Sequence, residues 1–430
     1  MRINSRRALT LIVLFALALR FATALALGDR AEAISGAADQ YTYDVLGQRV
    51  LAGYGFSFPV EWYPFTPANT QTAHWSFAYP LYLAAVYALT GHHPLIARLL
   101  QALVSALSIV LVYRIGRRLF GELAGLAAAL LAAGYAYLIF FNAALMTQTF
   151  YIVCLLAALD LALQLAEQPR RRDWLLLGAT LGLGVLFRQT LLLFVPLVYL
   201  WLFWRVPAPN QSSAWVPSRV RARLRWRDLL LSVAVLAACI APWTVRNALV
   251  YQDFLLLNSN GGYFLYSANH PQQGTNFDPD YAAPLPDELR GMNEAAEDRA
   301  LYRAAFNFIA SDPARFVLLS LNRTKDYFWL LPSEQSSLIS NVSRVFSFAL
   351  YLPFMLAGLA LSRAQWRLAL PLYLYVALDS VVHLASWAAP RYRLPSDAVL
   401  TVFAGLAVAS VAVALWNWRF KARVGAAPNV

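Results

Sequence analysis

Residues 397–416 read DAVLTVFAGLAVASVAVALW, a run whose first residue, Asp397, carries its only charged side chain. About 20 mostly apolar residues are what an α-helix needs to cross the hydrocarbon core of a bilayer. Nine more apolar runs precede this one, some of them shorter or interrupted by a charge. The ten predicted spans are 8–27, 94–113, 121–142, 146–166, 173–188, 189–205, 228–249, 345–362, 368–388 and 397–416. We therefore expect an all-α integral membrane protein with about ten transmembrane helices.

The composition of the whole chain agrees with this expectation. Of its 430 residues, 60% are hydrophobic and 13% are charged, whereas soluble domains average about 45–50% apolar and about 25% charged residues. These proportions exclude an ordinary cytosolic enzyme, a disordered chain and a nucleic-acid-binding domain. Cys154 and Cys239 both lie in apolar runs, so they provide neither a disulfide framework nor the spacing of a zinc site.

The basic residues predict the orientation of the bundle. If the N-terminus is cytoplasmic, the inner segments carry twenty basic residues against four acidic ones, as the positive-inside rule requires. The net charge of +12 therefore needs no nucleic-acid partner. We expect a multi-pass protein of the cytoplasmic (inner) membrane with both termini in the cytoplasm. The arginine-rich inner loop 206–227 is also suited to touch anionic membrane lipids.

Two long segments fall on the outer side, residues 28–93 and 250–344. In the first, residues 77–90 are apolar and aromatic but too short to span comfortably, so we expect a helix lying at the interface. In the second we expect a helix near 294–310 and an amphipathic one at 313–331. Neither segment is long enough for an enzyme domain with its own large core, which places any chemistry at the outer membrane face.

The predicted organisation therefore has three parts. They are an N-terminal transmembrane module, 1–249, whose first outer loop, 28–93, is catalytic; a small extracytoplasmic region with interfacial helices, 250–344; and a C-terminal transmembrane module, 345–430.

An aspartate in the first outer segment is the leading candidate for chemistry. Asp39 and Tyr43 are four residues apart, a spacing that puts both on one face of a helix. A carboxylate near the membrane surface, partly shielded from water, can act as general base toward a hydroxyl group. The structural alternative is that Asp39 caps a short interfacial helix. Asp44 lies on another face of that helix. Asp44 and Glu61 are the next candidates for the general base.

A set of cations is expected near the outer face. Guanidinium groups near a bilayer are costly unless they are paired or border a wet cavity, and their planar fork suits phosphate. The alternative for each is snorkelling to lipid headgroups. The set comprises Arg20, Arg98, Arg188, Arg246, Arg391 and Arg393, with Lys325 as an additional cation.

Other polar groups favour a structural reading. Asp160 and Asp379 lie in apolar runs and are expected to form structural pairs. His74 and His383 have no second ligand at metal spacing, which argues against zinc. The sequence contains no Walker A pattern and no glycine-rich dinucleotide fingerprint, which argues against a nucleotide donor.

Four stretches along the chain carry a resemblance to a known group. They are Asp39-x-x-x-Tyr43 with Leu51-x-Gly53-x-Gly55-Phe56; Tyr79-Pro80-Leu81-Tyr82 with Gly91, Arg98 and 113–121; Pro242-Trp243-x-x-Arg246-Asn247 with Asn260-Gly261-Gly262 and Asn269; and Arg391-Tyr392-Arg393-Leu394-Pro395. In this order they resemble polytopic GT-C glycosyltransferases of bacterial family 39, similar to protein O-mannosyltransferases and lipid A aminoarabinose transferases. The chain has Gln148 where relatives usually carry glutamate, and Gln40 where they often have a second acid.

The resemblance implies inverting transfer of a sugar from a polyprenyl-phosphate-linked donor to a hydroxyl of a lipid, glycan or protein acceptor. It implies Asp39 as the catalytic base, with Tyr43, Asp44, Glu61, His74, Asn247 and Tyr392 in support. It implies that the donor phosphate is bound by Arg391, Arg393 and Arg246, and behind them by Arg98, Arg188 and Lys325. It implies no cofactor and no metal-binding residues, although the replacements at Gln148 and Gln40 leave metal dependence open.

Two other classes of function remain open from the sequence. A transporter or flippase of lipid-linked sugars would also have many spans and buried charges. It would need gating elements on both faces, whereas the long segments here are all outside. A GT-C-like scaffold without activity is kept open by Gln148, although the intact Asp39 argues against it.

Overall fold

The computed structural model describes residues 4–34, 37–62, 66–204, 226–330 and 338–425. Across these ranges the chain is helical, and β-pairing is limited to two isolated bridges, Ser57–Gln71 and Trp62–Thr66. The predicted all-α membrane fold is confirmed. The inner loop 206–227, expected to touch lipid, lies almost wholly outside the described ranges.

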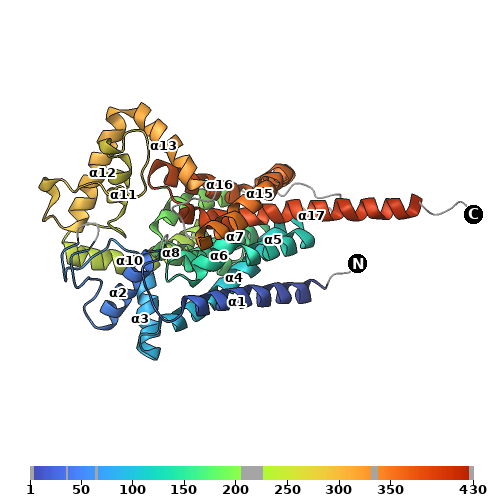
Figure 1. The fold of residues 1–430 in the computed structure, drawn as a ribbon, viewed down its shortest axis with the longest axis horizontal. Helices are drawn as coiled ribbons and strands as arrows, with labels where there is room; N and C mark the ends of the chain where they lie inside the picture. Colours follow the sequence, from blue (N-terminus) through green and yellow to red (C-terminus); the bar gives the residue numbers. More distant parts are fainter. Residues whose placement is uncertain (1–3, 35–36, 63–65, 205–225, 331–337, 426–430) are drawn as a thin grey trace, which may run out of the picture.

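The long helices lie side by side in a bundle (Figure 1). They are α1 (Ser5–Leu27), α4 (Pro94–Phe120), α5 (Glu122–Gly134), α6 (Ala136–Ala143), α7 (Gln148–Glu167), α8 (Arg171–Phe187), α9 (Val195–Trp204), α10 (Trp226–Tyr251), α15 (Leu350–Leu361), α16 (Trp366–Ala385) and α17 (Leu394–Gly425). The start of α1 and the end of α17 lie at the same end of the bundle (Figure 1).

The shorter helices gather mainly at the opposite end (Figure 1). There lie α2 (Asp39–Leu51), α3 (Ala78–Thr90), α11 (Gly261–Asn269), α12 (Glu294–Ser311) and α13 (Pro313–Tyr327), while α14 (Leu338–Arg344) leads back into the bundle. The helices predicted at 77–90, 294–310 and 313–331 are therefore confirmed as α3, α12 and α13. Pro94 and Pro313 each occupy the first position of a helix, where the missing N–H is not needed.

The count of ten transmembrane helices is not confirmed. Within the described ranges, six helical stretches are long and apolar enough to cross a membrane, or seven if α5 and α6, bent by 54°, form one span. The predicted runs 345–362 and 368–388 fall in a single helical stretch, Asn341–Ala385. The predicted runs 173–188 and 189–205 form helical segments of fewer than 18 residues, broken at Arg188, which has extended backbone. Hydrophobicity alone does not show where a helix breaks or continues.

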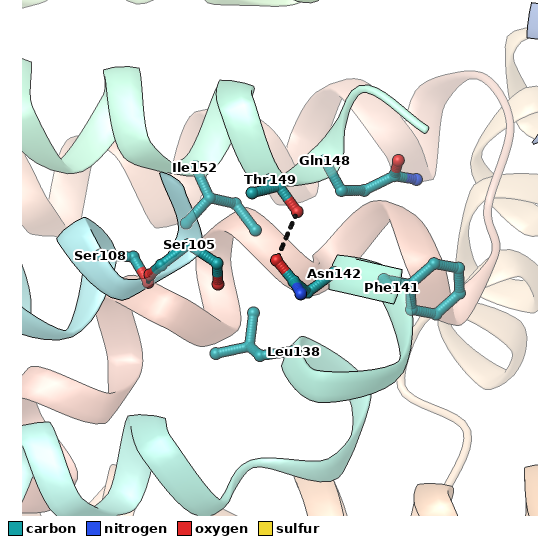
Figure 2. Close-up of a pocket in the computed structure, with 8 residues that line it drawn as sticks. All are labelled: Ser105, Ser108, Leu138, Phe141, Asn142, Gln148, Thr149 and Ile152. Carbon is teal, nitrogen blue, oxygen red and sulfur yellow. Dashed lines mark hydrogen bonds between the residues drawn. The ribbon is translucent and has the colours of Figure 1, made fainter. Parts of the chain in front are cut away.

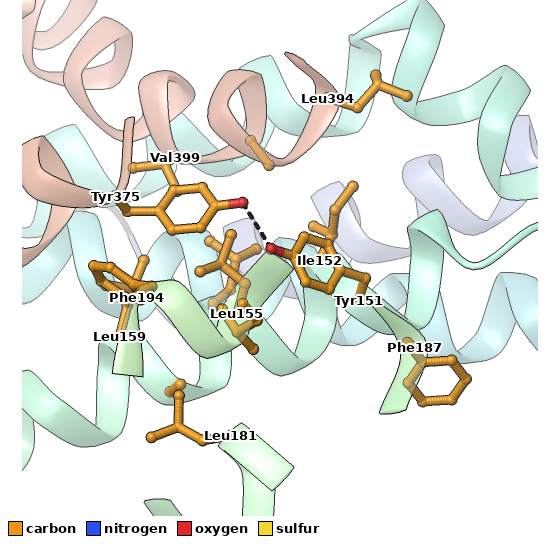
Figure 3. Close-up of a cluster of buried hydrophobic side chains, with 14 of the residues drawn as sticks. Tyr151, Ile152, Leu155, Leu159, Leu181, Phe187, Phe194, Tyr375, Leu394 and Val399 are labelled. Atoms are coloured by element: carbon orange, nitrogen blue, oxygen red, sulfur yellow. Dashed lines mark hydrogen bonds between the residues drawn. The ribbon is translucent and has the colours of Figure 1, made fainter. Parts of the chain in front are cut away.

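Small residues allow the helices of the bundle to approach closely. A Cβ on Gly405 of α17 would lie 2.6 Å from the main-chain oxygen of Ala124 and from Ala128 on α5. Such close backbone packing is typical of helices in membranes. Figure 3 shows a part of the core in which apolar side chains of α7, α8 and α17 surround the hydroxyls of Tyr151 and Tyr375, which are 3.1 Å apart.

The buried acid Asp160 forms the structural pair predicted for it. Its carboxylate lies 2.8 Å from Nη2 of Arg114 and 3.7 Å from Nε of Arg118. Both arginines belong to the last turns of α4, and Asp160 lies in the C-terminal half of α7. This charge cluster therefore stabilises the contact between two spans and is separate from the outer helices.

At the other end of the bundle, α2 is held tightly against α3. A Cβ on Gly47 would lie 2.8 Å from Cβ of Leu83, so the two helices touch at this glycine. Tyr43 packs edge-on against Tyr79, with ring centroids 5.2 Å apart. These contacts fix the orientation of α2 and thereby of Asp39 at its start.

Candidate active site

Asp39 lies against Arg391. Oδ2 of Asp39 is 3.1 Å from Nη1 of Arg391, and the two side chains are 26% and 20% exposed. The N-cap of α2 is Ala38, without a side-chain cap hydrogen bond, so Asp39 occupies the first turn rather than the predicted capping position. A negative charge is favourable there because of the helix dipole. The fold thus joins the candidate base to a candidate phosphate ligand from the far end of the chain.

Tyr392 brings a second arginine to this pair. Its hydroxyl accepts a hydrogen bond from Nη2 of Arg391 at 3.2 Å, and its ring lies 5.1 Å from the Arg391 guanidinium and 5.8 Å from that of Arg188. The ring stacks on His383, with centroids 4.8 Å apart and planes at 8°. Arg188 also donates from Nε to Oγ1 of Thr147 at 3.2 Å. Two guanidinium groups therefore lie near one tyrosine ring beside Asp39.

Tyr43 lies within the field of all these charges. Burial and the charge of Asp39 raise the pKa of Tyr43 above its ordinary value, while Arg188 and Arg391 oppose the shift. Tyr43 therefore stays a neutral phenol, with its ring against Trp75 and Tyr79. The structure brings together Asp39, Tyr43, Arg188, Arg391 and Tyr392, which we name the Asp39 cluster.

Asp379 lies beneath the Asp39 cluster. Its carboxylate accepts hydrogen bonds from Ser396 at 2.6 Å and Tyr327 at 3.2 Å, and lies 3.7 Å from Nε2 of His383. Among the described residues its direct partners are hydroxyl groups and a histidine, not an arginine. A buried carboxylate satisfied in this way supports the histidine on which Tyr392 stacks.

Two of the predicted phosphate ligands are used by the fold itself. Arg98 is fully buried and donates to the carbonyls of Ala143, Gly28 and Arg30 at 2.8–2.9 Å. Arg393 is also buried and pairs with Asp397, with Nε to Oδ1 at 2.9 Å. Neither side chain lies in the Asp39 cluster: main-chain carbonyls and Gln40 accept from Arg98. Asp397 and the carbonyl of Tyr327 hold Arg393, whose Nη2 has no hydrogen-bond partner in the described ranges.

Arg246 and Lys325, which were also predicted to bind the phosphate, make their contacts outside the Asp39 cluster. Arg246 donates to Oε1 of Gln71 at 3.0 Å and lies 4.7 Å from the ring of Trp243. Lys325 is exposed on α13, next to the carboxylate of Asp326, which its charge stabilises. Of the cations expected near the outer face, Arg188 and Arg391 are the two that lie beside Tyr392 in the described residues. Arg20 is buried and donates to Oγ of Ser105 and to the carbonyls of Ala16 and Ala133.

The remaining predicted site residues have mainly structural surroundings. Asp44 is buried and accepts from Tyr87 at 2.5 Å and Gln48 at 2.7 Å, with His92 at 3.0 Å. Asn247 is buried and donates to the carbonyls of Leu255 and Leu257.

His74 and Glu61 differ from each other in exposure. Burial lowers the pKa of His74 to about 3, so its ring is neutral where it packs on Trp75 and Phe264. Glu61 is exposed, at the edge of the described part of its loop. In the described ranges no three His, Cys, Asp or Glu side chains are grouped as metal ligands.

Sequence reasoning missed Glu294, which links the two outer segments. Its carboxylate accepts hydrogen bonds from N–H of Ala73 at 2.7 Å, Ser259 at 2.7 Å, Tyr251 at 3.1 Å and Thr66 at 3.1 Å. The only local signal is Asn293, the N-cap of α12, which marks Glu294 as a first-turn residue. Its partners are distant in sequence, so the link could not be read from the chain.

Part of the sequence matches a known protein family, and the fold is similar to solved membrane proteins. The model of the family of dolichyl-phosphate-mannose-protein mannosyltransferases matches residues 75–244. The apo oligosaccharyltransferase of Archaeoglobus fulgidus is 16% identical, with a TM-score of 0.56 over 100% of this chain and 53% of that one. ArnT from Cupriavidus metallidurans bound to undecaprenyl phosphate is 16% identical, with a TM-score of 0.53 over 93% of this chain and 59% of that one. No curated protein sequence matches the chain.

The fold is that of the GT-C class of polytopic membrane glycosyltransferases, as the resemblance implied. Within this class, the particular likeness by sequence is to the dolichyl-phosphate-mannose-protein mannosyltransferases, over residues 75–244. The chain spans about half the length of the solved oligosaccharyltransferase that it matches.

Proposed function

We propose that this protein transfers a sugar from a polyprenyl-phosphate-linked donor to a hydroxyl acceptor at the outer face of the cytoplasmic membrane, with inversion at the anomeric carbon. The observation that carries this proposal is the contact between Asp39 and Arg391. A carboxylate that can accept a proton and a cation that can stabilise a leaving phosphate are both required, and here they touch. Both groups are partly exposed, so a substrate can reach them.

The solved relatives support the choice of donor. The ArnT structure contains undecaprenyl phosphate, and an archaeal oligosaccharyltransferase AglB structure contains dolichol-phosphate with an inhibitory peptide. The same fold thus accommodates a polyprenyl phosphate in those proteins. We extend this to the present chain, with its three modules, 1–249, 250–344 and 345–430, and both termini on the cytoplasmic side.

The chemistry follows from the positions of the two charges. Asp39 takes the proton of the acceptor hydroxyl while its oxygen attacks the anomeric carbon. The bond from that carbon to the phosphate oxygen breaks, and the polyprenyl phosphate leaves with one additional negative charge. Asp39 becomes neutral in the same step, so the charge of Arg391 is released from the carboxylate and becomes available to the phosphate. Arg188, whose guanidinium lies 5.8 Å from the centroid of the Tyr392 ring, supplies a second preorganised cation.

The test is loss of sugar from undecaprenyl-phosphate-linked sugars, measured with the purified full chain in detergent and an acceptor extract. We expect turnover by the wild type and a loss of at least about 100-fold in Asp39→Asn, the lower end of the usual contribution of a general base. Glu32→Gln is the matched control, because Glu32 is an exposed acid of the same segment that pairs with the exposed Arg30. Turnover without a sealed membrane excludes a transporter. Equal turnover by wild type and Asp39→Asn would overturn the assignment of the base.

A further inference from the structure

Gln148, the first residue of α7, has a buried side chain whose amide is unsatisfied. The residue is 1% exposed, and neither Oε1 nor Nε2 has a hydrogen-bond partner in the part of the chain that the structure describes. Asn142 at the end of α6 is also 1% exposed, and its Nδ2 lacks a partner within the same ranges. Buried amides are normally hydrogen-bonded, so an unsatisfied one requires an explanation such as a ligand or an ordered water.

Both residues line one small cavity between α4, α6 and α7 (Figure 2). Ser105, Ser108 and Thr149 contribute its other polar groups, and Thr149 donates to Oδ1 of Asn142 at 3.4 Å. The space is large enough for about one water molecule or one hydroxyl group. Every polar group in this lining is a neutral amide or hydroxyl.

The chemistry of the amide selects the kind of group that it binds. Oε1 of Gln148 only accepts hydrogen bonds and Nε2 only donates them. A hydroxyl group both donates and accepts, so the one hydroxyl group that fits this space can bond to either atom of the amide. A phosphate oxygen only accepts and would leave Oε1 unsatisfied. An ammonium group would find no carboxylate in this lining.

The loop that joins α6 to α7 connects the cavity to the Asp39 cluster. N–H of Leu145 donates to Oε1 of Gln40, the residue that follows Asp39, at 3.4 Å. Thr147, the residue before Gln148, accepts from Arg188 at 3.2 Å. The loop that joins α6 to α7 therefore contacts the helix of the candidate base and one of its cations, and Gln148 emerges from that loop.

We propose that Gln148, with Asn142, binds one hydroxyl group of the sugar carried by the lipid-linked donor, and that this site selects a sugar with a neutral hydroxyl group at that position. The inference rests on the proposed function, because it places the sugar beside the base and cations of that reaction. It adds a specificity-determining site to the Asp39 cluster.

The test is binding by the purified full chain of undecaprenyl phosphate linked to mannose or glucose, compared with undecaprenyl phosphate alone. Gln148→Met has a similar length and makes no such hydrogen bonds. We expect it to bind the better of the two sugar-bearing lipids at least about tenfold more weakly, or about 1.4 kcal/mol, while its affinity for undecaprenyl phosphate stays within about twofold. Gln168→Met, an exposed glutamine just beyond the other end of α7, is the control and should bind both lipids as the wild type does.

The thermal stability of the variant separates binding from a structural role. Because Gln148 bonds to nothing in the described chain, Gln148→Met should unfold at the same temperature as the wild type or a higher one. Equal weakening toward both lipids, or no weakening toward either, would overturn the inference and leave the cavity to an internal water. A wild type that binds neither lipid would instead overturn the proposed function, since bare undecaprenyl phosphate tests that function without the sugar.

Discussion

The carboxylate of Glu294 accepts a hydrogen bond from the main-chain N–H of Ala73 at 2.7 Å, and this contact ties α12 to the first outer segment. Ser259 N–H also donates to the carbonyl of Ala73, at 3.1 Å, so three separate segments meet at one point. The segment after Ala73 runs through Trp75, which packs on Tyr43 with ring centroids 5.7 Å apart. The link thereby reaches the helix that carries Asp39.

Replacing Glu294 by alanine is expected to loosen the outer segments without unfolding the bundle. The substitution leaves four donors without their acceptor, and hydrogen bonds to a charged group contribute about 1.5–3 kcal/mol each, net of the bonds to water that they replace. Amide hydrogen exchange should accelerate around Ala73 and Ser259 and remain slow in α7 and α17. Glu288→Ala, at an exposed acid of the same outer segment, is the control. Unchanged exchange at Ala73 in Glu294→Ala would show that the link does not hold the segments.

The stability of the outer helices should fall as the pH rises through about 7. Burial, with repulsion from Glu294, raises the pKa of Glu297 and of Asp298 to about 7. The folded state therefore holds protons on these groups between about pH 4.5 and 7 that the unfolded state has released, so folding is favoured at the acidic end of that window. Protection factors in α11 and α12, which are corrected for the faster intrinsic amide exchange at higher pH, should be larger at pH 5.5 than at pH 8.

Asp298→Asn should remove part of this pH dependence. Asparagine can still accept the hydrogen bond that N–H of Gly262 donates to Asp298 at 2.7 Å, but it carries no charge to bury. At pH 8 the exchange of α11 should become slower than in the wild type. An exchange profile with the same dependence on pH in both proteins would contradict the assignment to Asp298.

Arg391→Lys should impair turnover although it keeps the charge. A guanidinium can contact Asp39 and the Tyr392 hydroxyl through two different nitrogens, as it does here, whereas an ammonium is a single point charge on a flexible stem. Loss of this positioning should lower kcat by about 10–100-fold, within the range that a misplacement of about 1 Å produces. Arg363→Lys, at an exposed arginine outside the Asp39 cluster, should leave kcat unchanged. A kcat for Arg391→Lys equal to the wild-type value would remove Arg391 from the reaction.

Asp160→Asn should affect stability and not turnover. It removes the carboxylate that pairs with Arg114 and Arg118 at the other end of α7. Arg114 is partly exposed and can turn to water, so the free energy of unfolding should fall by about 2 kcal/mol, as for a lost charged hydrogen bond. Turnover per folded molecule should equal that of the wild type, measured at a temperature where both are folded. A selective loss of turnover would indicate that Asp160 acts on the site over a distance.

By itself, the sequence determined the membrane class of the protein, the helices at α3, α12 and α13, and the pairing of Asp160, because hydrophobic runs, helical periodicity and the cost of a buried charge are local properties. Asp39 remains a predicted base, proposed from its spacing with Tyr43 and from the resemblance. The tertiary structure alone decided which predicted cations meet Asp39. Arg98 donates to main-chain carbonyls and Arg393 pairs with Asp397. Arg188 and Arg391 instead lie near the ring of Tyr392.

The same holds for the number of spans and for the two residues that sequence reasoning did not place. Helix breaks depend on packing, so the ten apolar runs became six or seven candidate spans. Glu294 has no signal of its contacts in the chain, and its carboxylate acquires partners at Thr66, Ala73, Tyr251 and Ser259. Gln148 was noted only as a departure from relatives, and the fold leaves its side chain without a hydrogen-bond partner in the described ranges. Both outcomes arise from long-range contacts, which the folded arrangement creates and the order of residues does not display.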